Sequence, residues 1–436
     1  MRKYFSLFIF LICFSSFASV KIHEEAYVLG QNPEVVRELV ETGSVIIDHV
    51  TSEGFEVYGN HGLLNYLDKK NIPYLDTQSM KQNAGPGYPS FEEMSEKLKS
   101  LAARYPGIAQ LFSIGKSVNG KDLWVMKISD NVEVDEVEPE FKYISSMHGD
   151  EITGRELTVR LIEEILEKYG KDNSITELVN NTEIFIMPSM NPDGSEMKRR
   201  SNAKYTDLNR NFPDITRDRE SHSKGREVEV QAVMKFQEER QFSLSGNFHG
   251  GTVVANYPWD SKYELHPFND LLRELSLGYA ELNPEMRNSR EFTGGVTNGA
   301  QWYVVRGGMQ DWSYNWHNDL QITFELSHKK WPNYSEIPTH YENNKDSLIH
   351  FMKQIHQGVG FKIGREGVEG SVRIKQTSPV QKDLGNYGFK KSEFYKVLPE
   401  GEYVFEVSDK DKGVQVMNLR VEKDQIRPNG NFSLLK

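Results

Sequence analysis

The segment from Phe91 to Gly358 most constrains the fold, because apolar strand-like runs alternate along it with helical patterns. This alternation predicts one large α/β domain. At 436 residues, the chain is long enough to hold that domain and smaller modules as well. The strongest helical pattern covers Glu151 to Tyr169, with apolar residues at helical spacing at Leu157, Leu161, Ile162 and Leu166.

A smaller module is expected on each side of this domain. Residues 20–75 alternate strand-like runs with helical patterns at 33–41 and 62–70, which predicts a small α/β module. A polar stretch containing Gly and Pro, from Thr77 to Ser90, predicts the linker. After Gly358 short alternating runs predict a small all-β module. The expected boundaries are therefore 19–85 for the first module and its linker, 86–358 for the large domain and 359–436 for the last module.

The first 18 residues are typical of a cleaved export signal. Arg2 and Lys3 precede an apolar run from Tyr4 to Phe14, and small residues follow around Ala18. The only cysteine, Cys13, lies inside this segment, so the mature protein would have no disulfide and no thiol nucleophile or ligand. The prediction is an exported protein, either periplasmic or secreted.

The charge balance argues against a nucleic-acid partner. Acidic residues outnumber basic ones by 63 to 52, giving a net charge of -11, and no long Lys/Arg block offsets this locally. Beyond the signal no stretch reaches the roughly 18 apolar residues that a transmembrane helix needs. We therefore expect no stable membrane insertion.

Three residues have the side chains of a catalytic zinc site. His148 and Glu151 follow an apolar run that predicts a strand, and His249 begins a Gly-rich turn after the predicted strand 242–248. Two His and one Glu are a zinc ligand set that leaves a position for water. Taken alone, the HxxE spacing is weak, and His249 could equally be a hydrogen-bonded residue of a glycine turn.

Two further stretches carry polar groups that suit peptide chemistry. Glu325 stands in the otherwise apolar run 320–326, where a carboxylate costs stability unless it has a partner or a function. Residues 199–202 and 207–212 combine Arg with Asn, which together offer donors to a carboxylate such as a free C-terminus. The alternative for these residues is a solvated loop.

Read in order, the motifs of residues 90–358 closely resemble those of the zinc metallocarboxypeptidases of the carboxypeptidase A superfamily. The motifs are HGDE, NPDG, RRSNA, DLNRNFPD, HGG followed by VANYPWD, FTGGVTNGAQWY, GGMQD and TFEL. The resemblance is to the regulatory branch typified by carboxypeptidases E, N and D, and the last module is similar to the transthyretin-like domain of that branch. It implies an α/β fold with a mixed central sheet flanked by helices.

The resemblance implies a role for each matching residue. His148, Glu151 and His249 would hold one Zn²⁺ per chain, Asp207 would orient His148, and Glu325 would be the general base. Arg200 would polarise the scissile carbonyl, with Arg199 as the less favoured alternative. Residues expected to bind substrate are Asn209 and Arg210 on the terminal carboxylate, Tyr303 as a closing aromatic, and Asp260 with Gln310 in the side-chain pocket.

The expected function is hydrolysis of the C-terminal residue, Lys or Arg, from peptides or proteins by a monomeric enzyme. A carboxylate at Asp260 favours a basic side chain, although a helix or turn cap is the alternative role for this residue. Two alternative functions are a peptidoglycan-peptide carboxypeptidase or amidase of the same superfamily, and a non-catalytic peptide-binding relative.

Two features depart from the regulatory branch. Asp150 stands within the HxxE motif where the digestive branch has an arginine, which leaves one cation fewer in the site. The module at 20–75 is not typical of the regulatory branch and is similar to the inhibitory pro-segments of the digestive branch. We therefore expect it to block the site or to assist folding.

Overall fold

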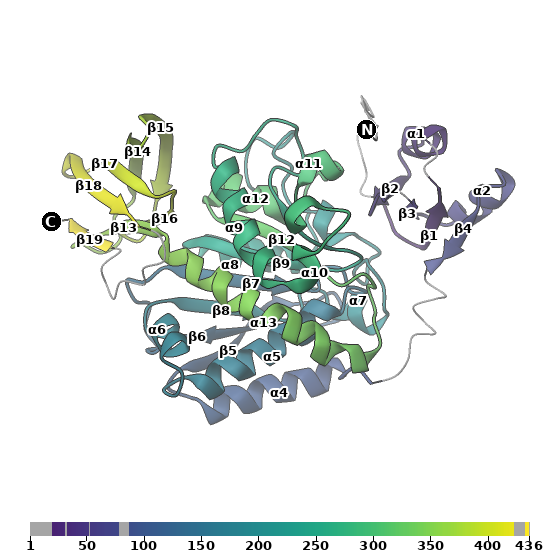
Figure 1. Cartoon of the computed structure of the whole chain (residues 1–436), viewed down its shortest axis with the longest axis horizontal. Helices are drawn as coiled ribbons and strands as arrows, with labels where there is room; N and C mark the ends of the chain where they lie inside the picture. The colour runs from purple at the N-terminus through teal and green to yellow at the C-terminus, as the bar shows by residue number, and fades with distance from the viewer. Residues whose placement is uncertain (1–19, 31–32, 52, 78–86, 423–431, 436) are drawn as a thin grey trace.

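The computed structural model describes residues 20–30, 33–51, 53–77, 87–422 and 432–435. The predicted export signal and residues 78–86 of the predicted linker lie outside this part of the chain. A large central domain (residues 87–357) carries an N-terminal module (residues 20–77) on one side and a C-terminal module (residues 358–435) on the opposite side (Figure 1).

The central domain is built on a mixed sheet of eight strands in the order β11-β10-β12-β9-β7-β8-β6-β5. Strands β12, β9, β7 and β8 are mutually parallel neighbours, whereas the pairs β10–β12, β6–β8 and β5–β6 are antiparallel. The mixed central sheet expected from the sequence is thus confirmed. The strands are β5 (Ala109–Lys116), β6 (Asp122–Ile128), β7 (Glu140–Ser145), β8 (Glu183–Met187), β9 (Phe242–His249), β10 (Val253–Tyr257), β11 (Val296–Asn298) and β12 (Leu320–Leu326).

Helices cover both faces of this sheet. The helix predicted from Glu151 begins at Thr153 instead, because Glu151 and Ile152 still belong to the turn that leaves β7. The helices are α4 (Phe91–Arg104), α5 (Thr153–Lys168), α6 (Asn173–Val179), α7 (Pro192–Glu196), α8 (Val228–Glu238), α9 (Asn269–Leu282), α10 (Pro284–Arg287), α11 (Gly299–Trp302), α12 (Met309–His317) and α13 (Ile337–Lys353), with 3-10 turns η1 (Leu208–Arg210), η2 (Thr293–Gly295), η3 (Tyr334–Glu336) and η4 (Gln354–His356).

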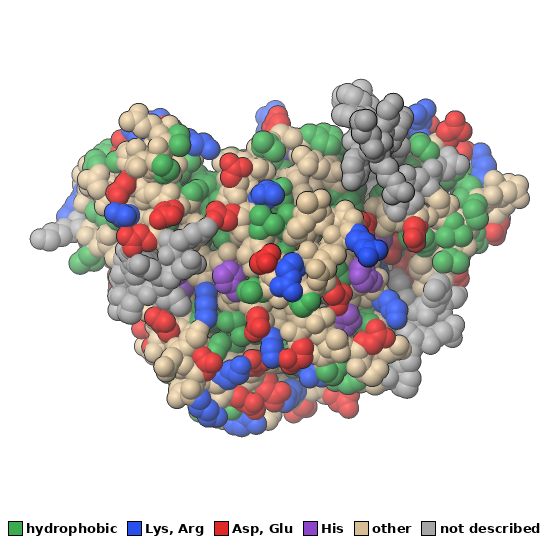
Figure 2. Space-filling view, viewed as in Figure 1, with side chains coloured by type: hydrophobic (Ala, Val, Ile, Leu, Met, Phe, Trp, Pro, Cys, Tyr) green, Lys and Arg blue, Asp and Glu red, His purple; other side chains and the backbone are tan. Residues whose placement is uncertain are grey.

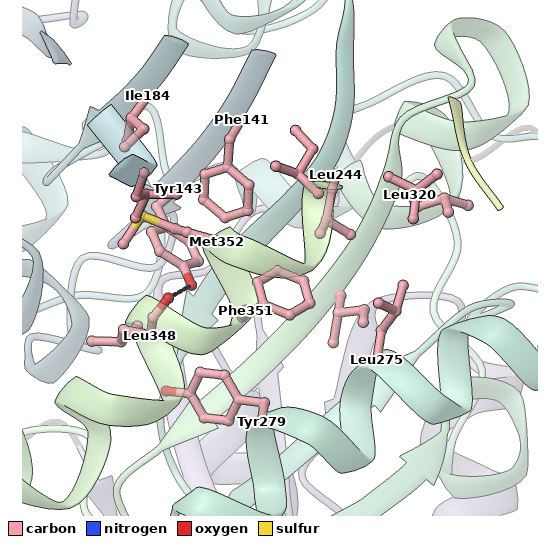
Figure 3. Close-up of a cluster of buried hydrophobic side chains, with 14 of the residues drawn as sticks. Phe141, Tyr143, Ile184, Leu244, Leu275, Tyr279, Leu320, Leu348, Phe351 and Met352 are labelled. Atoms are coloured by element: carbon pink, nitrogen blue, oxygen red, sulfur yellow. Dashed lines mark hydrogen bonds between the residues drawn. The ribbon is translucent and has the colours of Figure 1, made fainter. Parts of the chain in front are cut away.

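The apolar side chains of the sheet form a separate core on each face. On one face α5, α9 and α13 pack against the strands, and Phe141, Tyr143 and Phe351 meet there (Figure 3). The buried Tyr143 hydroxyl donates to the carbonyl of Leu348 at 2.9 Å, so this ring joins the sheet to α13 without an unpaired polar atom. The second core, on α8 and α12, includes Trp312. Close packing on both faces fixes the strand ends that carry the site.

The N-terminal module is a four-stranded antiparallel sheet with two helices. Its sheet order is β2-β3-β1-β4, and its elements lie where the apolar pattern of the sequence places them, apart from the short β4. The module has its own apolar core, separate from those of the central domain. Its elements are β1 (Glu24–Leu29), α1 (Pro33–Glu41), β2 (Val45–Asp48), β3 (Gly54–Gly59), α2 (Leu63–Lys69) and β4 (Tyr74–Asp76).

The C-terminal module is strand-rich and consists of two sheets, β16-β13-β19 and β15-β14-β17-β18. Its buried residues belong to the same apolar cluster as α13 and the central sheet. Its strands are β13 (Gly358–Ile363), β14 (Gly370–Ser378), β15 (Lys382–Phe389), β16 (Glu393–Val397), β17 (Gly401–Asp409), β18 (Gly413–Val421) and β19 (Phe432–Leu435).

The visible face of the molecule mixes acidic and basic side chains (Figure 2). On this face no broad area of one sign stands out, in keeping with the dispersed charges of the sequence. Within the described ranges, none of the helices combines the length and apolar composition that a membrane span requires.

Candidate active site

Three neighbouring strands bring four distant residues together. His148 and Glu151 follow β7, His249 is the last residue of β9, and Glu325 lies on β12 directly opposite His249 in the ladder. Because β12, β9 and β7 run parallel, their carboxyl ends share one edge of the sheet. This edge is where ligands bind in many α/β folds.

The three predicted metal ligands point at one another. Glu151 Oε2 lies 3.0 Å from His148 Nδ1 and 2.8 Å from His249 Nδ1, and the two Nδ1 atoms are 3.1 Å apart. All three residues are buried. Two imidazole nitrogens and a carboxylate oxygen that face one buried point form a donor set suited to Zn²⁺. The residues present therefore fit a zinc ion.

The outer nitrogens of both histidines have partners that can orient the rings. His148 Nε2 lies 3.1 Å from Asp207 Oδ1, as the resemblance implied, and His249 Nε2 lies 3.0 Å from Asn247 Nδ2. Asn247 Oδ1 is buried and has no hydrogen-bond partner in the part of the chain that the structure describes. Turning this amide by 180° would let Oδ1 accept the Nε2 proton and leave His249 Nδ1 free to bind a metal. The sequence analysis did not identify Asn247.

Glu325 lines the same pocket as the ligands, and within the described ranges its buried Oε2 atom has no hydrogen-bond partner. Burial raises the pKa of Glu325 well above its ordinary value, and the negative charges of Glu151 and Asp48 raise it further. A carboxylate with a raised pKa is suited to taking a proton near neutral pH.

Arg200, and not Arg199, reaches the metal ligands. Arg200 is 2% exposed, donates from Nε to Asp207 Oδ2 at 2.9 Å, and lies with Nη1 3.5 Å from Glu151 Oε1. Arg199 instead stacks on the ring of Tyr205, 5.2 Å from its centroid. Of the two arginines, Arg200 is thus the one that lies beside the metal ligands.

The predicted carboxylate clamp lies on the short turn η1. Asp207 accepts from Asn209 N at 2.8 Å and so caps this turn, while it also binds His148. Asn209 and Arg210 both line the pocket that contains the metal ligands, as does Tyr303. Asp207 therefore fixes the position of His148 relative to the turn that carries Asn209 and Arg210.

Asp260 and Gln310, which the resemblance assigns to the side-chain pocket, are in contact in the structure. Asp260 Oδ1 accepts from Gln310 Nε2 at 2.9 Å and from Asn256 Nδ2 at 3.1 Å. The alternative role as a cap finds no support, because the side-chain bonds of Asp260 go to these two amides. A Cβ on Gly299 would lie 1.8 Å from Asp260 Oδ1, so only glycine fits beside this carboxylate.

Asp311, which sequence reasoning missed, holds the Asp260 turn. It accepts from the backbone N of Asp260 and of Ser261, at 2.9 Å each. Burial raises the pKa of Asp260 well above its usual range, and the nearby charge of Asp311 adds to this. A bound Lys or Arg side chain would offset both effects by supplying a positive charge.

Residues of the N-terminal module line this pocket. From the sequence the module was expected to block the site or to assist folding, but none of its residues was assigned to the pocket. Asp48 is 4% exposed and its Oδ2 accepts from Arg200 Nη2 and, at 3.4 Å, from Arg210 Nη2. The hydroxyl of Tyr303 also donates to this carboxylate. Burial alone would raise the pKa of Asp48, but the charges of Arg200 and Arg210 outweigh it and hold the pKa well below its usual range.

Comparison with known proteins gives the same family as the motifs. Residues 94–347 match the family described as zinc carboxypeptidase. Carboxypeptidase D of Homo sapiens is 38% identical over 381 residues, which cover 79% of this chain and 27% of that relative. Carboxypeptidase M of Mus musculus is 38% identical over 343 residues, which cover 73% of this chain and 77% of that relative. The chain thus spans about a quarter of the length of carboxypeptidase D.

Solved structures show the same fold at low sequence identity. Thrombin activatable fibrinolysis inhibitor superposes with a TM-score of 0.58 and 18% identity, covering 76% of this chain and 98% of that one. The carboxypeptidase A from Helicoverpa armigera gives a TM-score of 0.60 and 17% identity, covering 76% and 97%. By its matched residues and by its similarity to carboxypeptidases D and M, the chain belongs to the zinc carboxypeptidase family.

Proposed function

We propose that this protein hydrolyses the last peptide bond of peptides or proteins that have a free C-terminus. The observation that carries the proposal is the convergence of His148 Nδ1, Glu151 Oε2 and His249 Nδ1 on one buried point that Glu325 faces. A ligand triangle with a carboxylate beside it is the arrangement that metal-assisted hydrolysis of a carbonyl requires.

In this proposal each side chain has a separate task. Bound between the three ligands, zinc would supply Lewis-acid activation of a water molecule. Glu325 would act as the general base that takes a proton from the attacking water, and would return it to the leaving amine. Arg200 donates hydrogen bonds to the oxygen on which negative charge develops.

Binding of the substrate is assigned to the residues beyond Arg200. Arg210 and Asn209 hold the terminal carboxylate, and Tyr303 covers it. The buried carboxylate of Asp260, held by Gln310 and Asn256, favours Lys or Arg as the last residue. The amine or guanidinium of such a substrate would pair with the Asp260 carboxylate, whose negative charge is otherwise disfavoured by burial.

Two broader expectations belong to the same proposal. The first 18 residues are proposed as an export signal, which would place the protein in a periplasm or outside the cell. The C-terminal module is proposed as a transthyretin-like domain, and its two sheets support this assignment.

The test compares matched peptides that end in Arg, Lys, Phe or diaminopimelate. The enzyme is the full chain carrying a specific protease site within residues 78–86, cleaved and separated from the N-terminal module before the assay. Release of Arg or Lys that stops on chelation and returns with zinc would support the proposal. Release of diaminopimelate alone would favour the peptidoglycan alternative, and no release with zinc present would favour a non-catalytic relative.

A variant separates the pocket from the chemistry. Asp260→Ala should lower kcat/KM for Arg peptides by about 100-fold, the cost of truncating one partner of a buried charge pair. The same change should alter kcat/KM for Phe peptides much less. Equal losses on both peptides would contradict the assignment of Asp260 to specificity.

We further propose that the N-terminal module inhibits the enzyme while it is attached. The support is chemical: the carboxylate of Asp48 takes its hydrogen bonds from Arg200, Arg210 and Tyr303, the groups assigned to a substrate's carbonyl and carboxylate. A peptide cannot place its terminal carboxylate there while Asp48 holds those donors.

The inhibition is tested in the intact chain. Asp48→Ala should raise kcat/KM for an Arg peptide by at least about tenfold, because the charged hydrogen bonds that hold the module in the pocket are lost. The matched control is Glu53→Ala, which removes an exposed carboxylate from the same module. Equal activity of the two variants would contradict the inhibitory role of Asp48.

A further inference from the structure

The N-terminal module places a second carboxylate in the pocket, on a lysine of the central domain that the mechanism above does not use. Lys330 follows β12, is 8% exposed, and donates from Nζ to Glu56 Oε2 at 2.6 Å and to Tyr58 OH at 2.6 Å. Both partners are on β3 of the module. Lys330 is therefore covered by the module rather than by the central domain alone.

The position of Lys330 relative to the metal ligands is shown by a chain of contacts. Lys330 Nζ lies 3.4 Å from Glu151 Oε1, and Arg200 Nη1 lies 3.5 Å from the same oxygen. On the other side, Arg200 and Arg210 share the carboxylate of Asp48. The contacts therefore run in the order Arg210, Asp48, Arg200, Glu151, Lys330 and Glu56. Arg210 of the carboxylate clamp lies at one end, and the pair of Lys330 with Glu56 lies at the other.

A substrate would follow the same order. If its terminal carboxylate lies where Asp48 lies and its scissile carbonyl lies beside Arg200, then the residues upstream of the scissile bond run toward Lys330. The side chain of Glu56 shows that a carboxylate fits against this ammonium group within hydrogen-bond distance. A cation in a mostly buried cleft attracts a carboxylate more strongly than it would in water.

We infer that Lys330 forms a second anion-binding subsite, which selects substrates with an acidic side chain one or two residues upstream of the scissile bond. The inference rests on the proposed function and narrows its substrate class to peptides with an acidic residue near a basic C-terminus. Glu56 fills this subsite in the attached module, as Asp48 fills the carboxylate clamp.

The test uses the full chain cleaved within residues 78–86, with Asp48→Ala and Glu56→Gln so that the module no longer competes. Peptides ending in Arg carry Glu, Gln or Lys at each of the two positions before the scissile bond. At one of these positions kcat/KM should be about tenfold higher for Glu than for Gln, as expected for one charged hydrogen bond in a cleft.

Variants of the lysine decide whether the preference comes from this residue. In Lys330→Gln the ratio of Glu to Gln peptides should fall to about one, and in Lys330→Glu the Lys peptide should become the better substrate. Lys329→Gln is the matched control, because its side chain is 66% exposed and bonds away from the site to Glu336. It should keep the wild-type ratio.

The outcomes distinguish this inference from the proposed function. Cleavage of all peptides at equal rates would overturn the inference alone, as would a preference that survives in Lys330→Gln. A uniform loss on every peptide in that variant, with the ratio unchanged, would mean that Lys330 only positions Glu151. Should the variants not fold, the wild-type preference and its decrease at high salt still test the subsite. Failure to cleave any peptide would overturn the proposed function and this inference together.

Discussion

The two small modules are attached to the central domain in different ways. The core of the C-terminal module, including Phe361 and Phe405, is continuous with the core around α13. The N-terminal module keeps a separate core and meets the central domain largely through charged and polar groups, among them Asp48 and Glu56. A shared apolar core makes a permanent joint, whereas a polar interface over a working site can be released.

Hydrogen bonds to backbone groups contribute little to the interface between the N-terminal module and the central domain. Lys21 forms an isolated bridge with Thr206, and Trp302 Nε1 donates to the carbonyl of Val50 at 3.2 Å. At the interface of the C-terminal module with the central domain, the hydroxyl of the buried Tyr395 donates to the carbonyl of Ile355 at 2.9 Å.

The largest effect is expected from the shared core. Phe361→Ala removes a fully buried ring and should lower the free energy of unfolding of the central domain by about 3 to 5 kcal/mol. Denaturant unfolding, followed by tryptophan fluorescence, should show one transition that moves as a whole. Val57→Ala is the control in the separate core of the N-terminal module, and it should leave that transition in place. A separate unfolding transition for the C-terminal module would contradict the view that it shares one core with the central domain.

A smaller effect is expected where the N-terminal module docks. After cleavage within residues 78–86, Asp48→Ala should weaken the binding of the module to the rest of the chain by about 2 to 3 kcal/mol, because two arginines lose a shared acceptor. Titration calorimetry with the separated pieces would measure the change. Unaltered affinity would show that contacts other than this carboxylate hold the module.

The C-terminal joint contains a buried lysine whose removal should be stabilising. Lys396 is 1% exposed, its Nζ has no hydrogen-bond partner within the described ranges, and it lies 4.4 to 5.1 Å from the ring centroids of Phe268, Tyr314 and Tyr387. Burial lowers the pKa of Lys396 to about 7. Lys396→Met should raise the free energy of unfolding at pH 6 by about 1 to 2 kcal/mol.

The pH dependence of this effect has a defined sign. Between pH 7 and pH 10 the unfolded lysine binds a proton that the buried amine does not, so wild-type stability should rise with pH in that range. Below pH 7 both states are protonated, and the cost of burying the charge is constant. The difference in free energy of unfolding between Lys396→Met and the wild type should therefore decrease from pH 7 to pH 10. A constant difference would contradict the assignment.

The smallest effect concerns acid and the N-terminal interface. His23 stacks on Tyr205 of the central domain and on His61, with ring centroids 4.0 and 4.2 Å apart. Burial, then the charges of His61 and Arg199, lower the pKa of His23. Docking is then fully favoured above the ordinary histidine pKa of 6.5 and weakens as the pH falls below it. Module affinity should drop about twofold to threefold between pH 7 and pH 5.5, and less in His23→Phe.

The fold of each part follows from local sequence patterns, but the contacts between parts do not. The ranges 33–41 and 62–70 contain the two helices of the N-terminal module, because their apolar residues repeat at helical spacing. His148, Glu151, His249 and Glu325 could be proposed together because each lies on or after an apolar run that predicts a strand, and strand ends meet at a sheet edge.

Asp48 and Lys330 could not be found in this way. Asp48 ends an ordinary short strand, and Lys330 is one of two adjacent lysines, so neither stands out from surface residues. Their importance arises only when β2 of the module docks on Arg200 and Arg210 and β3 docks on the loop after β12. This docking depends on the shapes of two folded surfaces. Asp311 was missed for a similar reason, since its bonds go to backbone groups across the pocket.

We propose that the N-terminal module covers a working carboxypeptidase site. The most direct test measures release of Arg from one peptide by the intact chain and by the same chain cleaved within residues 78–86 and separated from the module. Both are loaded with zinc, and Glu325→Gln is the inactive control. We expect slow release of Arg by the intact chain and release at least about tenfold faster after the module is removed. In Glu325→Gln the rate of release should fall by about 1,000-fold or more. Equal rates before and after cleavage, or full activity of Glu325→Gln, would contradict this proposal.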